Sequence, residues 1–248
     1  MTIHPAAARG FARSADAYER SRPAYPRSAI EWLRERLGLG PGKTVIDLAA
    51  GTGKLSRPLA ATGAEVVAVE PLAEMRMAIG PHIRAVEGTA ESIPVREAGA
   101  DAVTVGQAFH WFAHGAALAE MHRVLRPGGM LALVWNRRRL EDPIHAAVEQ
   151  ILSPYHRDVP THRSDAWRAA FDSTSLFGAL EERTFANAQV LDADGLADRF
   201  ASTSFIAALR DGERHAVLAR IRALGAAGPV TLRYVAEVQV SARTPGRL

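Results

Sequence analysis

A glycine-containing turn lies between an apolar run and a helical stretch in the first quarter of the chain. Residues 45–48 are typical of a buried strand, Gly51 and Gly53 follow them, and a helix is predicted to begin near Lys54. Glycine adopts backbone conformations that are closed to other residues and leaves room for a ligand against the main chain. The first turn of a helix directs unpaired N–H groups at the same place. The pattern therefore predicts a site for a carboxylate or a phosphate.

A carboxylate stands at the end of the next apolar run. Glu70 follows residues 65–69 and comes seventeen residues after Gly53. Open α/β sheets place an acid here to accept hydrogen bonds from a ribose diol, and the two oxygens of a carboxylate match two hydroxyls. The glycine turn alone would indicate only a turn. Strand, turn, helix and acid together indicate a nucleoside-type ligand.

A parallel sheet is needed to bring these residues to one edge. From residue 45 to 136, short β-rich runs alternate with helical stretches, which is typical of a parallel sheet covered on both faces. The predicted strands are nearly all apolar, as strands buried on both sides must be, and they span 44–48, 65–70, 83–87, 102–105 and 130–135. The predicted helices span 26–37, 54–61, 72–79 and 116–125. We expect the last helix to end at Arg126-Pro-Gly-Gly129, because proline cannot continue a helix.

The pattern changes after residue 136. Helices are predicted at 143–152, 194–200 and 212–224, and strands at 180–190 and 230–240. The last strand alternates strictly, which places on one face Leu232, Tyr234, Ala236, Val238 and Val240. Such alternation suits an antiparallel pair that closes the sheet edge. An α/β fold class is therefore predicted.

Composition excludes several classes of protein. The chain has 248 residues, of which 48% are hydrophobic and 23% charged, the balance of an ordinary globular protein. No cysteine is present, so disulfides and cysteine nucleophiles are excluded. No apolar run is long enough for a bilayer and no secretory signal is visible, so we expect no membrane partner and a cytoplasmic location. The basic residues are scattered arginines rather than a stripe interleaved with aromatics, so we expect no nucleic-acid partner.

Four segments follow one another in the order and spacing of a known family. They are Asp47-Leu-Ala-Ala-Gly-Thr-Gly53, Val69-Glu-Pro71 with Met75, Gly88-Thr-Ala-Glu-Ser-Ile-Pro94 and Val124-Leu-Arg-Pro-Gly-Gly129. Over about residues 44–136 the chain resembles the class I S-adenosylmethionine-dependent methyltransferases. The segments 17–26 and 107–112 resemble those of a bacterial small-molecule branch, the methyltransferase type 11-like proteins.

The resemblance implies a Rossmann-like α/β fold. We expect a seven-stranded, mostly parallel sheet with helices on both faces, an antiparallel last strand pair, an N-terminal helical lid and a helical insertion or cap after the fifth strand. One continuous domain would comprise the lid and first helix (1–42), the cofactor-binding core (43–136), and the acceptor cap with the closing strand pair (137–248). The implied cofactor is S-adenosyl-L-methionine, with S-adenosyl-L-homocysteine as its product.

The resemblance also implies which residues bind the cofactor. The methionine part would be held by Asp47, Ala49, Gly51 and Gly53, and the ribose hydroxyls by Glu70. The adenine side would be lined by Pro71, Met75, Thr89, Ala90 and Glu91, and the site would be closed by Gln107 and Ala108. Tyr18 and Arg22 would lie over the cofactor, with Arg22 near its carboxylate. Ala49 stands where the family often has a glycine, and Thr89 where many members have an aspartate beside adenine.

The acceptor side has one candidate base. His110 follows the fourth strand, and an imidazole with an ordinary pKa near 6.5 suits proton removal at neutral pH; the alternative is that it only forms a wall. An apolar acceptor site or plain core would be formed by Phe109, Trp111, Phe112, Trp135 and Trp167. Arg137 could attract an anionic acceptor or lie in a solvated loop. No metal site is predicted, because His110 and His114 have no third ligand. We expect surface positions for His122, His145, His156 and His162.

Three functions are compatible with these features. The first is methyl transfer to an oxygen or nitrogen, less readily a carbon, of a small-molecule acceptor by a monomer or homodimer. The second is a nicotinamide-dependent oxidoreductase, although residues 49–54 lack the G-x-G-x-x-G spacing that admits a pyrophosphate. The third is a non-catalytic protein that binds S-adenosylmethionine.

Overall fold

The computed structural model describes residues 19, 21–155 and 166–245. The chain divides into two compact units. The unit called here the sheet unit comprises Tyr25–Trp135, Pro160–Phe185 and Ala236–Leu248. The helical unit comprises Met1–Ala24, Asn136–Val159 and Ala186–Val235. The predicted division into 1–42, 43–136 and 137–248 stays a prediction.

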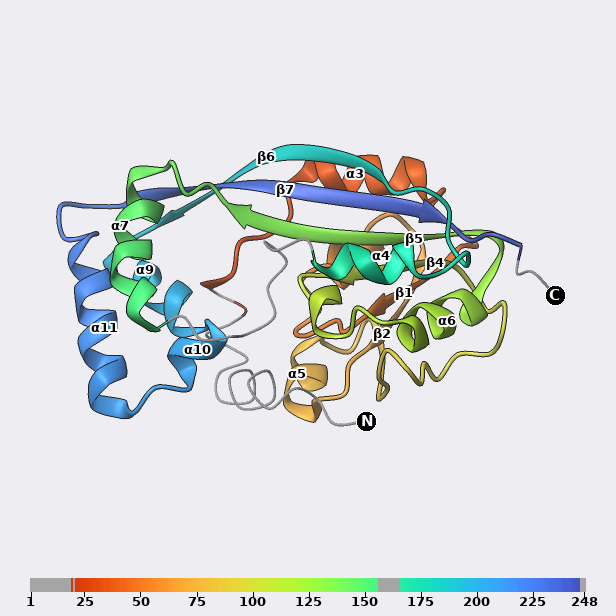
Figure 1. Ribbon diagram of the computed structural model, residues 1–248, viewed down its shortest axis with the longest axis horizontal. Helices are drawn as coiled ribbons and strands as arrows, with labels where there is room; N and C mark the ends of the chain where they lie inside the picture. Colours follow the sequence, from red (N-terminus) through yellow and green to blue (C-terminus); the bar gives the residue numbers. More distant parts are fainter. Residues whose placement is uncertain (1–18, 20, 156–165, 246–248) are drawn as a thin grey trace. The chain divides into compact units, whose positions relative to one another are not determined.

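The described residues form a seven-stranded sheet in the order β3-β2-β1-β4-β5-β7-β6. Its strands are β1 (Thr44–Leu48), β2 (Glu65–Val69), β3 (Arg84–Val86), β4 (Ala100–Gly106), β5 (Leu125–Arg138), β6 (Glu181–Leu191) and β7 (Val230–Ala242). The pairs β1–β2, β1–β4, β2–β3 and β4–β5 are parallel. The arrow of β7 runs against those of β5 and β6 (Figure 1). The predicted seven-stranded, mostly parallel sheet with an antiparallel last pair is confirmed.

The helices agree with the prediction within a few residues. They are α3 (Arg27–Arg36), α4 (Ser56–Ala60), α5 (Ala73–Ala78), α6 (Gly115–Val124), α7 (Pro143–Leu152), α9 (Ala193–Ala201) and α11 (Asp211–Ala223). Short elements that no pattern predicted are η1 (Phe109–Trp111), η2 (Ser153–Tyr155), η4 (Ala166–Arg168), α8 (Ala169–Asp172) and α10 (Ser204–Ala207). None of the helices among the described residues is both long enough and apolar enough to span a membrane.

One predicted boundary was wrong. We expected the fifth strand to begin at residue 130 after a turn, whereas β5 begins at Leu125 directly after α6. Leu125 pairs with Ala100, the register then shifts, and regular pairing resumes where Met130 meets Ala102. Gly128 has φ +77°. The proline–glycine segment is therefore an irregularity inside the strand rather than a loop before it, as in a β-bulge.

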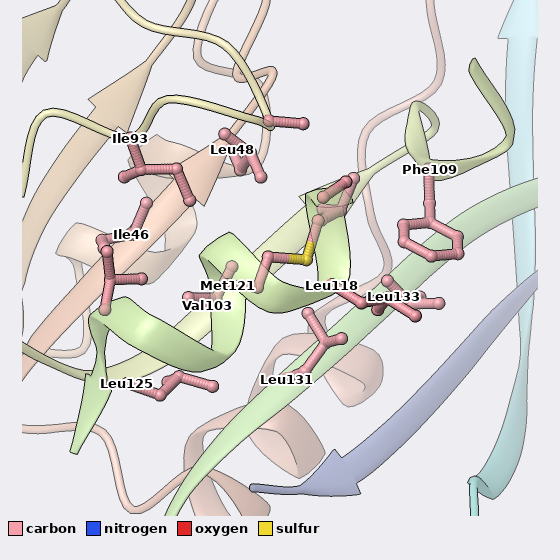
Figure 2. Close-up of a cluster of buried hydrophobic side chains, with 14 of the residues drawn as sticks. Ile46, Leu48, Ile93, Val103, Phe109, Leu118, Met121, Leu125, Leu131 and Leu133 are labelled. Carbon is pink, nitrogen blue, oxygen red and sulfur yellow. The ribbon is translucent and has the colours of Figure 1, made fainter. Parts of the chain in front are cut away.

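Alternation along the strands divides the core of the sheet unit between the two sheet faces. Ile46 and Leu48 belong to one cluster together with residues of α6, and Figure 2 shows Leu118 and Met121 of this helix beside Leu131 and Leu133. The neighbouring residue Val45 belongs to a second cluster, with residues of α3 and α4. Successive strand residues point to opposite faces, so helices cover both faces, as predicted.

The helical unit has a core of its own. Its buried residues come from α7, α9, α10 and α11 and include Leu232 and Tyr234 from β7. The predicted alternation in β7 is confirmed, because all five of its inward residues are buried. Asp142 caps α7 by accepting hydrogen bonds from Ile144 N (3.1 Å) and His145 N (3.3 Å). Proline at the first helical position suits the same start.

The expected surface position was wrong for two histidines. His145 is fully buried, with its ring centroid 5.0 Å from that of Tyr234. His122 is buried against Phe177, and its Nε2 lies 2.9 Å from the carbonyl oxygen of Thr244. Both histidines lie on helices, α6 and α7, on the side that carries other buried residues, and each packs against an aromatic ring from a distant part of the chain. His156 and His162 lie outside the described residues.

Candidate active site

The candidate site lies at the carboxyl ends of β1, β2 and β4 in the sheet unit. The strand order reverses between β1 and β4, which are neighbours although β2 and β3 separate them in the chain. Ligands of open α/β sheets bind outside the carboxyl ends of the strands at such a reversal. The segments that leave these three strands carry most of the cofactor residues expected from the sequence.

Glu70 joins two of these segments. Its Oε2 accepts a hydrogen bond from Gly51 N (2.9 Å), and its Oε1 accepts one from Leu72 N (3.0 Å). The residue is 6% exposed, and burial raises the pKa of its carboxyl, against the two backbone N–H groups and the charge of Arg76, which lower it. A carboxylate has about four lone-pair positions. Each oxygen therefore keeps capacity for one hydroxyl of a ribose.

The turn after β1 provides open main chain next to this carboxylate. Gly51 has φ +57°, and a Cβ built on it would meet no atom within 4 Å. Gly53 has φ +81°, where a Cβ would lie 3.2 Å from Arg57 and Ile79. Ala49 is also left-handed, with φ +54°. The backbone at Gly51 leaves space that a ligand can occupy, and the role expected for the turn stays a prediction.

Asp47 has another environment. It is 0% exposed, and its Oδ2 accepts from the hydroxyl of Ser56 (2.5 Å) while its Oδ1 accepts from that of Thr104 (3.1 Å). Burial raises the pKa of Asp47 to about 6, and the charge of Glu70 adds to the rise, whereas the two hydroxyls lower it. In the structure this side chain ties β1 to α4 and β4, and contact with a methionine moiety stays a prediction.

The expected adenine side is built by α5 and the segment after β3. Met75 and Ala90 are buried. Arg76 Nη1 donates to the carbonyl oxygens of Glu70 and Pro71, at 2.8 Å each. Thr89 exchanges both backbone hydrogen bonds with Ser92, at 3.2 Å each. These hydrogen bonds fix the main chain on the expected adenine side, and contact with adenine stays a prediction.

The side chain of Glu91 is engaged by a histidine that the sequence did not single out for this role. His114 caps α6, because its Nδ1 accepts from Ala117 N (3.4 Å). Nε2 must then carry the ring proton of the neutral form, and it lies 3.0 Å from Glu91 Oε1. Contact of Glu91 with adenine would therefore use its backbone groups.

Gln107 closes the end of β4 in a strained conformation. Its φ is +61°, and its N–H donates to the carbonyl oxygen of Val134 (2.8 Å). Ala108 packs against the core beside it. Non-glycine residues in the left-handed region cluster at functional sites, so Ala49 and Gln107 mark the ends of the two adjacent strands at the reversal.

Comparison with known proteins agrees with this geometry. A family model described as a methyltransferase domain matches residues 46–133. The uncharacterized methyltransferase Rv3342 of Mycobacterium tuberculosis is 48% identical over 132 residues, which are 52% of each chain, so the chain spans about half the length of that relative. The uncharacterized methyltransferase-like protein C25B8.10 of Schizosaccharomyces pombe is 34% identical over 82% of this chain and 81% of its own. The chain belongs to the class I S-adenosylmethionine-dependent methyltransferase family. A solved candidate Type II methyltransferase of Anaeromyxobacter dehalogenans has the same fold, with a TM-score of 0.68 and 24% identity over 90% of this chain and 97% of its own.

The residues of this methyltransferase family member fit the family's cofactor. Spare lone pairs on Glu70 suit the ribose hydroxyls, and the open main chain at Gly51 suits the amino-acid tail. Membership favours this reading over a nicotinamide-dependent oxidoreductase.

The base expected on the acceptor side, His110, lies in η1. Burial lowers the pKa of its imidazole to about 4. The ring is therefore neutral at pH 7 and able to accept a proton, although it is a weaker base than an exposed histidine. Its ring centroid lies 5.0 Å from that of Trp111, which is partly buried, as is Phe112. Among the described residues no cluster of three metal-binding side chains is present.

Two of the expected acceptor residues lie inside the core of the sheet unit. Phe109 is 0% exposed, and its ring centroid lies 6.0 Å from that of Trp167. Trp135 is 1% exposed, and its centroid lies 4.8 Å from that of the same tryptophan. Neither side chain offers surface to an acceptor in this arrangement. Their contacts are those of core residues, which was the alternative to an acceptor site.

The remaining expected residues belong to the helical unit. Arg22 donates from Nε to Ser202 Oγ (3.1 Å) and from Nη2 to Ser202 O (2.7 Å). Arg137 is partly buried, and its two arginine neighbours contact Glu149 and Glu141. The expected contacts of Arg22 with the cofactor and of Arg137 with an acceptor stay predictions. Tyr18 lies outside the described residues.

Sequence reasoning missed the residues that support the site. Ser56 and Thr104 bind both oxygens of Asp47, and Gly106 admits Tyr25, whose hydroxyl oxygen would lie 2.6 Å from a Cβ on that glycine. A glycine at the end of a strand is a signal of close approach, which could have identified Gly106. No pattern signals the two hydroxyls.

Proposed function

We propose that this chain transfers a methyl group from S-adenosylmethionine to an oxygen or nitrogen atom of a small molecule and releases S-adenosylhomocysteine. The observation that carries the proposal is the position of Glu70. Its two oxygens hold the main chain of the turn after β1 and of the segment before α5 at 2.9 and 3.0 Å, and each retains a lone pair. That arrangement suits a ribose diol at the end of the second strand.

Positioning supplies most of the chemistry in this proposal. When bound, the cofactor supplies an electrophilic methyl group on a sulfonium. An acceptor lone pair must then be held in line with the methyl carbon, and good orientation alone accelerates such a step strongly. In this proposal the turn around Gly51 would hold the amino-acid tail of the cofactor, and the carboxylate of Glu70 would hold its ribose.

His110 is the candidate that removes the acceptor's proton. With its pKa near 4, the imidazole is unprotonated throughout the neutral range. A hydroxyl or a protonated nitrogen has a proton to lose during transfer, and a histidine at the end of β4 is within the region where acceptors bind in such sheets. Oxygen or nitrogen acceptors are therefore favoured over carbon.

The proposal extends to partners and location. We expect a small-molecule acceptor, no nucleic acid and no membrane, a cytoplasmic location, and a monomer or homodimer. Scattered arginines, rather than a basic stripe, support the absence of nucleic acid. Analytical ultracentrifugation of the purified chain would test the oligomeric state.

Calorimetric titration tests the cofactor first. The wild-type chain is expected to bind S-adenosylmethionine and S-adenosylhomocysteine but not NAD, which requires a different turn. The variant Glu70→Ala is expected to bind S-adenosylmethionine at least tenfold more weakly. Its matched control is Glu74→Ala, because Glu74 is exposed on α5. Absence of binding by the wild-type chain would remove the proposal.

Incubation with methyl-labelled cofactor and fractionated small-molecule extracts tests turnover. Label is expected in a small molecule, and NMR of the product identifies the methylated atom as oxygen or nitrogen. Binding without any transfer would favour the non-catalytic alternative, and a carbon-bound methyl group would contradict the proposed acceptor class.

A further inference from the structure

Arg199 is a buried cation without a carboxylate. It lies on α9 in the helical unit and is 6% exposed. Its Nε donates to the hydroxyl of Tyr234 (3.1 Å), and its guanidinium carbon lies 5.4 Å and 5.8 Å from the ring centroids of Phe200 and Tyr234. Among the described residues no acidic side chain lies within ion-pair distance of it. Buried charges are normally paired, so this one requires an explanation.

Two other arginines of the helical unit, Arg138 and Arg233, each have a carboxylate partner. Glu149 binds Arg138 at 2.8 Å. Asp142 binds Arg233 at 3.0 Å through Oδ2, while its Oδ1 caps α7. Arg138 and Arg233 are therefore paired with carboxylates, whereas Arg199 contacts only two aromatic rings and a hydroxyl. Cation–π contacts offset part of the cost of burying the charge.

The terminal nitrogens of Arg199 can still be reached. Nη1 and Nη2 donate to no described residue, and neither is among the polar atoms that are fully enclosed without a partner. The small surface that the residue retains therefore includes donors. A planar guanidinium edge with two free donors matches two oxygens of a carboxylate or a phosphate.

His145 adds a second group that lacks partners. It is fully buried, and neither Nδ1 nor Nε2 makes a hydrogen bond of normal geometry to a described residue. Its ring stands edge-on to Tyr234, the aromatic residue whose hydroxyl binds Arg199. Burial lowers the pKa of His145 to about 4, and the charge of Arg138 lowers it further, against Asp142 and the backbone of Arg233. The ring is neutral and retains one N–H donor.

We propose that Arg199, oriented by Tyr234, binds the carboxylate or phosphate group of a small molecule in the helical unit. His145, which packs against Tyr234, is enclosed and neutral and does not compensate the charge of Arg199. The bound oxyanion supplies the negative charge that the chain does not place beside Arg199. The guanidinium donates from its terminal nitrogens, and the tyrosine hydroxyl fixes the orientation of the guanidinium through Nε. These residues differ from those on which methyl transfer was proposed.

Thermal unfolding and calorimetry of the full-length chain test the site with two probes, inorganic phosphate and succinate, at constant ionic strength set with sodium chloride. We expect a saturable rise of the unfolding midpoint with at least one probe. A response to phosphate alone identifies a phosphate group as the ligand, and a response to succinate alone identifies a carboxylate. No saturable response to either probe would overturn the proposal.

Substitutions decide whether Arg199 is responsible. Arg199→Met is expected to weaken binding of the active probe at least tenfold, whereas Arg220→Met, at an exposed position on α11, leaves it unchanged. Arg199→Lys keeps the charge but not the fork, and it should bind more weakly than wild type while unfolding at a similar temperature. This second variant serves where Arg199→Met fails to fold. Equal binding by wild type and either Arg199 variant would overturn the proposal.

A cofactor titration separates this site from the proposed function. Arg199→Lys should bind S-adenosylmethionine as the wild-type chain does. If the wild-type chain binds an oxyanion but no cofactor, the proposed function fails and the oxyanion site stands. If it binds cofactor but no oxyanion, the oxyanion site is refuted and the proposed function stands.

Discussion

Asp47→Asn should stabilise the protein, and the gain should grow with pH. The carboxyl of Asp47 is fully buried, and its pKa rises from the ordinary 3.8 to about 6. A raised pKa means that the folded chain holds the proton more tightly than the unfolded chain. Stability from this group is therefore complete below pH 3.8 and is lost as pH rises through about 6.

The magnitude follows from the shift. The difference between 3.8 and about 6 corresponds to about 3 kcal/mol at 1.36 kcal/mol per unit. Asparagine carries no charge, and it can accept from one hydroxyl and donate to the other, so contacts with Ser56 and Thr104 can persist. Part of this difference already arises below pH 4, so the unfolding free energy of the variant minus that of wild type should rise by about 2.4 kcal/mol between pH 4 and pH 7.

Two buried histidines make the stability of the wild-type chain depend on pH in the opposite direction, and comparing the variant with wild type removes their effect. Burial lowers the pKa values of His110 and His145 to about 4. Each therefore contributes stability that is present above its ordinary value of 6.5 and is lost as pH falls towards 4. The wild-type profile is the sum of both trends, but the two histidines are the same in the variant.

Urea denaturation at several pH values between 4 and 8, followed by tryptophan fluorescence, measures the difference. Asp198→Asn is the matched control, because it makes the same substitution at an exposed position on α9. A difference for Asp47→Asn that stays level or falls with rising pH would refute the reasoning about burial.

Further predictions concern the site. Glu70→Ala should weaken S-adenosylmethionine binding at least tenfold, or about 1.4 kcal/mol, in calorimetry; an unchanged dissociation constant would remove Glu70 from the site. Gly106→Ala should lower the unfolding free energy by about 1–3 kcal/mol, because its Cβ would lie 2.6 Å from the hydroxyl oxygen of Tyr25; Tyr25→Phe in the same chain should restore part of the loss. If His110 is the base, His110→Ala should lower turnover with little change in cofactor affinity. Because its pKa is near 4, wild-type turnover should show no step from this group between pH 6 and 8, and a histidine-dependent step there would contradict the buried state.

The sheet could be predicted because its signals are local. The strands predicted at 44–48 and 65–70 are mostly apolar runs of strand length, and the observed strands β1 and β2 match them to within one residue. Alternation in β7 was visible in the same way, since a period of two is a property of neighbouring residues. Leu125 was missed as a strand residue because its pairing with Ala100 depends on a register shift that no local pattern encodes.

The environment of Asp47 could not be predicted for a related reason. Its partners stand nine and 57 positions away in the chain, on α4 and on β4. Neither serine nor threonine is unusual where it stands, and only the fold brings both hydroxyls to one carboxylate. Family resemblance indicates that an acid belongs at this position but not what its oxygens contact.

The left-handed residues Ala49 and Gln107 show where local preference and tertiary structure disagree. Neither residue type favours a positive φ, and each such position costs about 1–3 kcal/mol. Ala50 N donates to Val69 O (3.2 Å) and Gln107 N to Val134 O (2.8 Å), so hydrogen bonds to neighbouring strands hold both bends in place. The two bends lie where β1 and β4 end side by side, at the reversal of strand order. At both positions the main chain turns away from the strand end, which leaves the strand ends open to a ligand. The hydrogen bonds to the neighbouring strands maintain the strain that this turn costs.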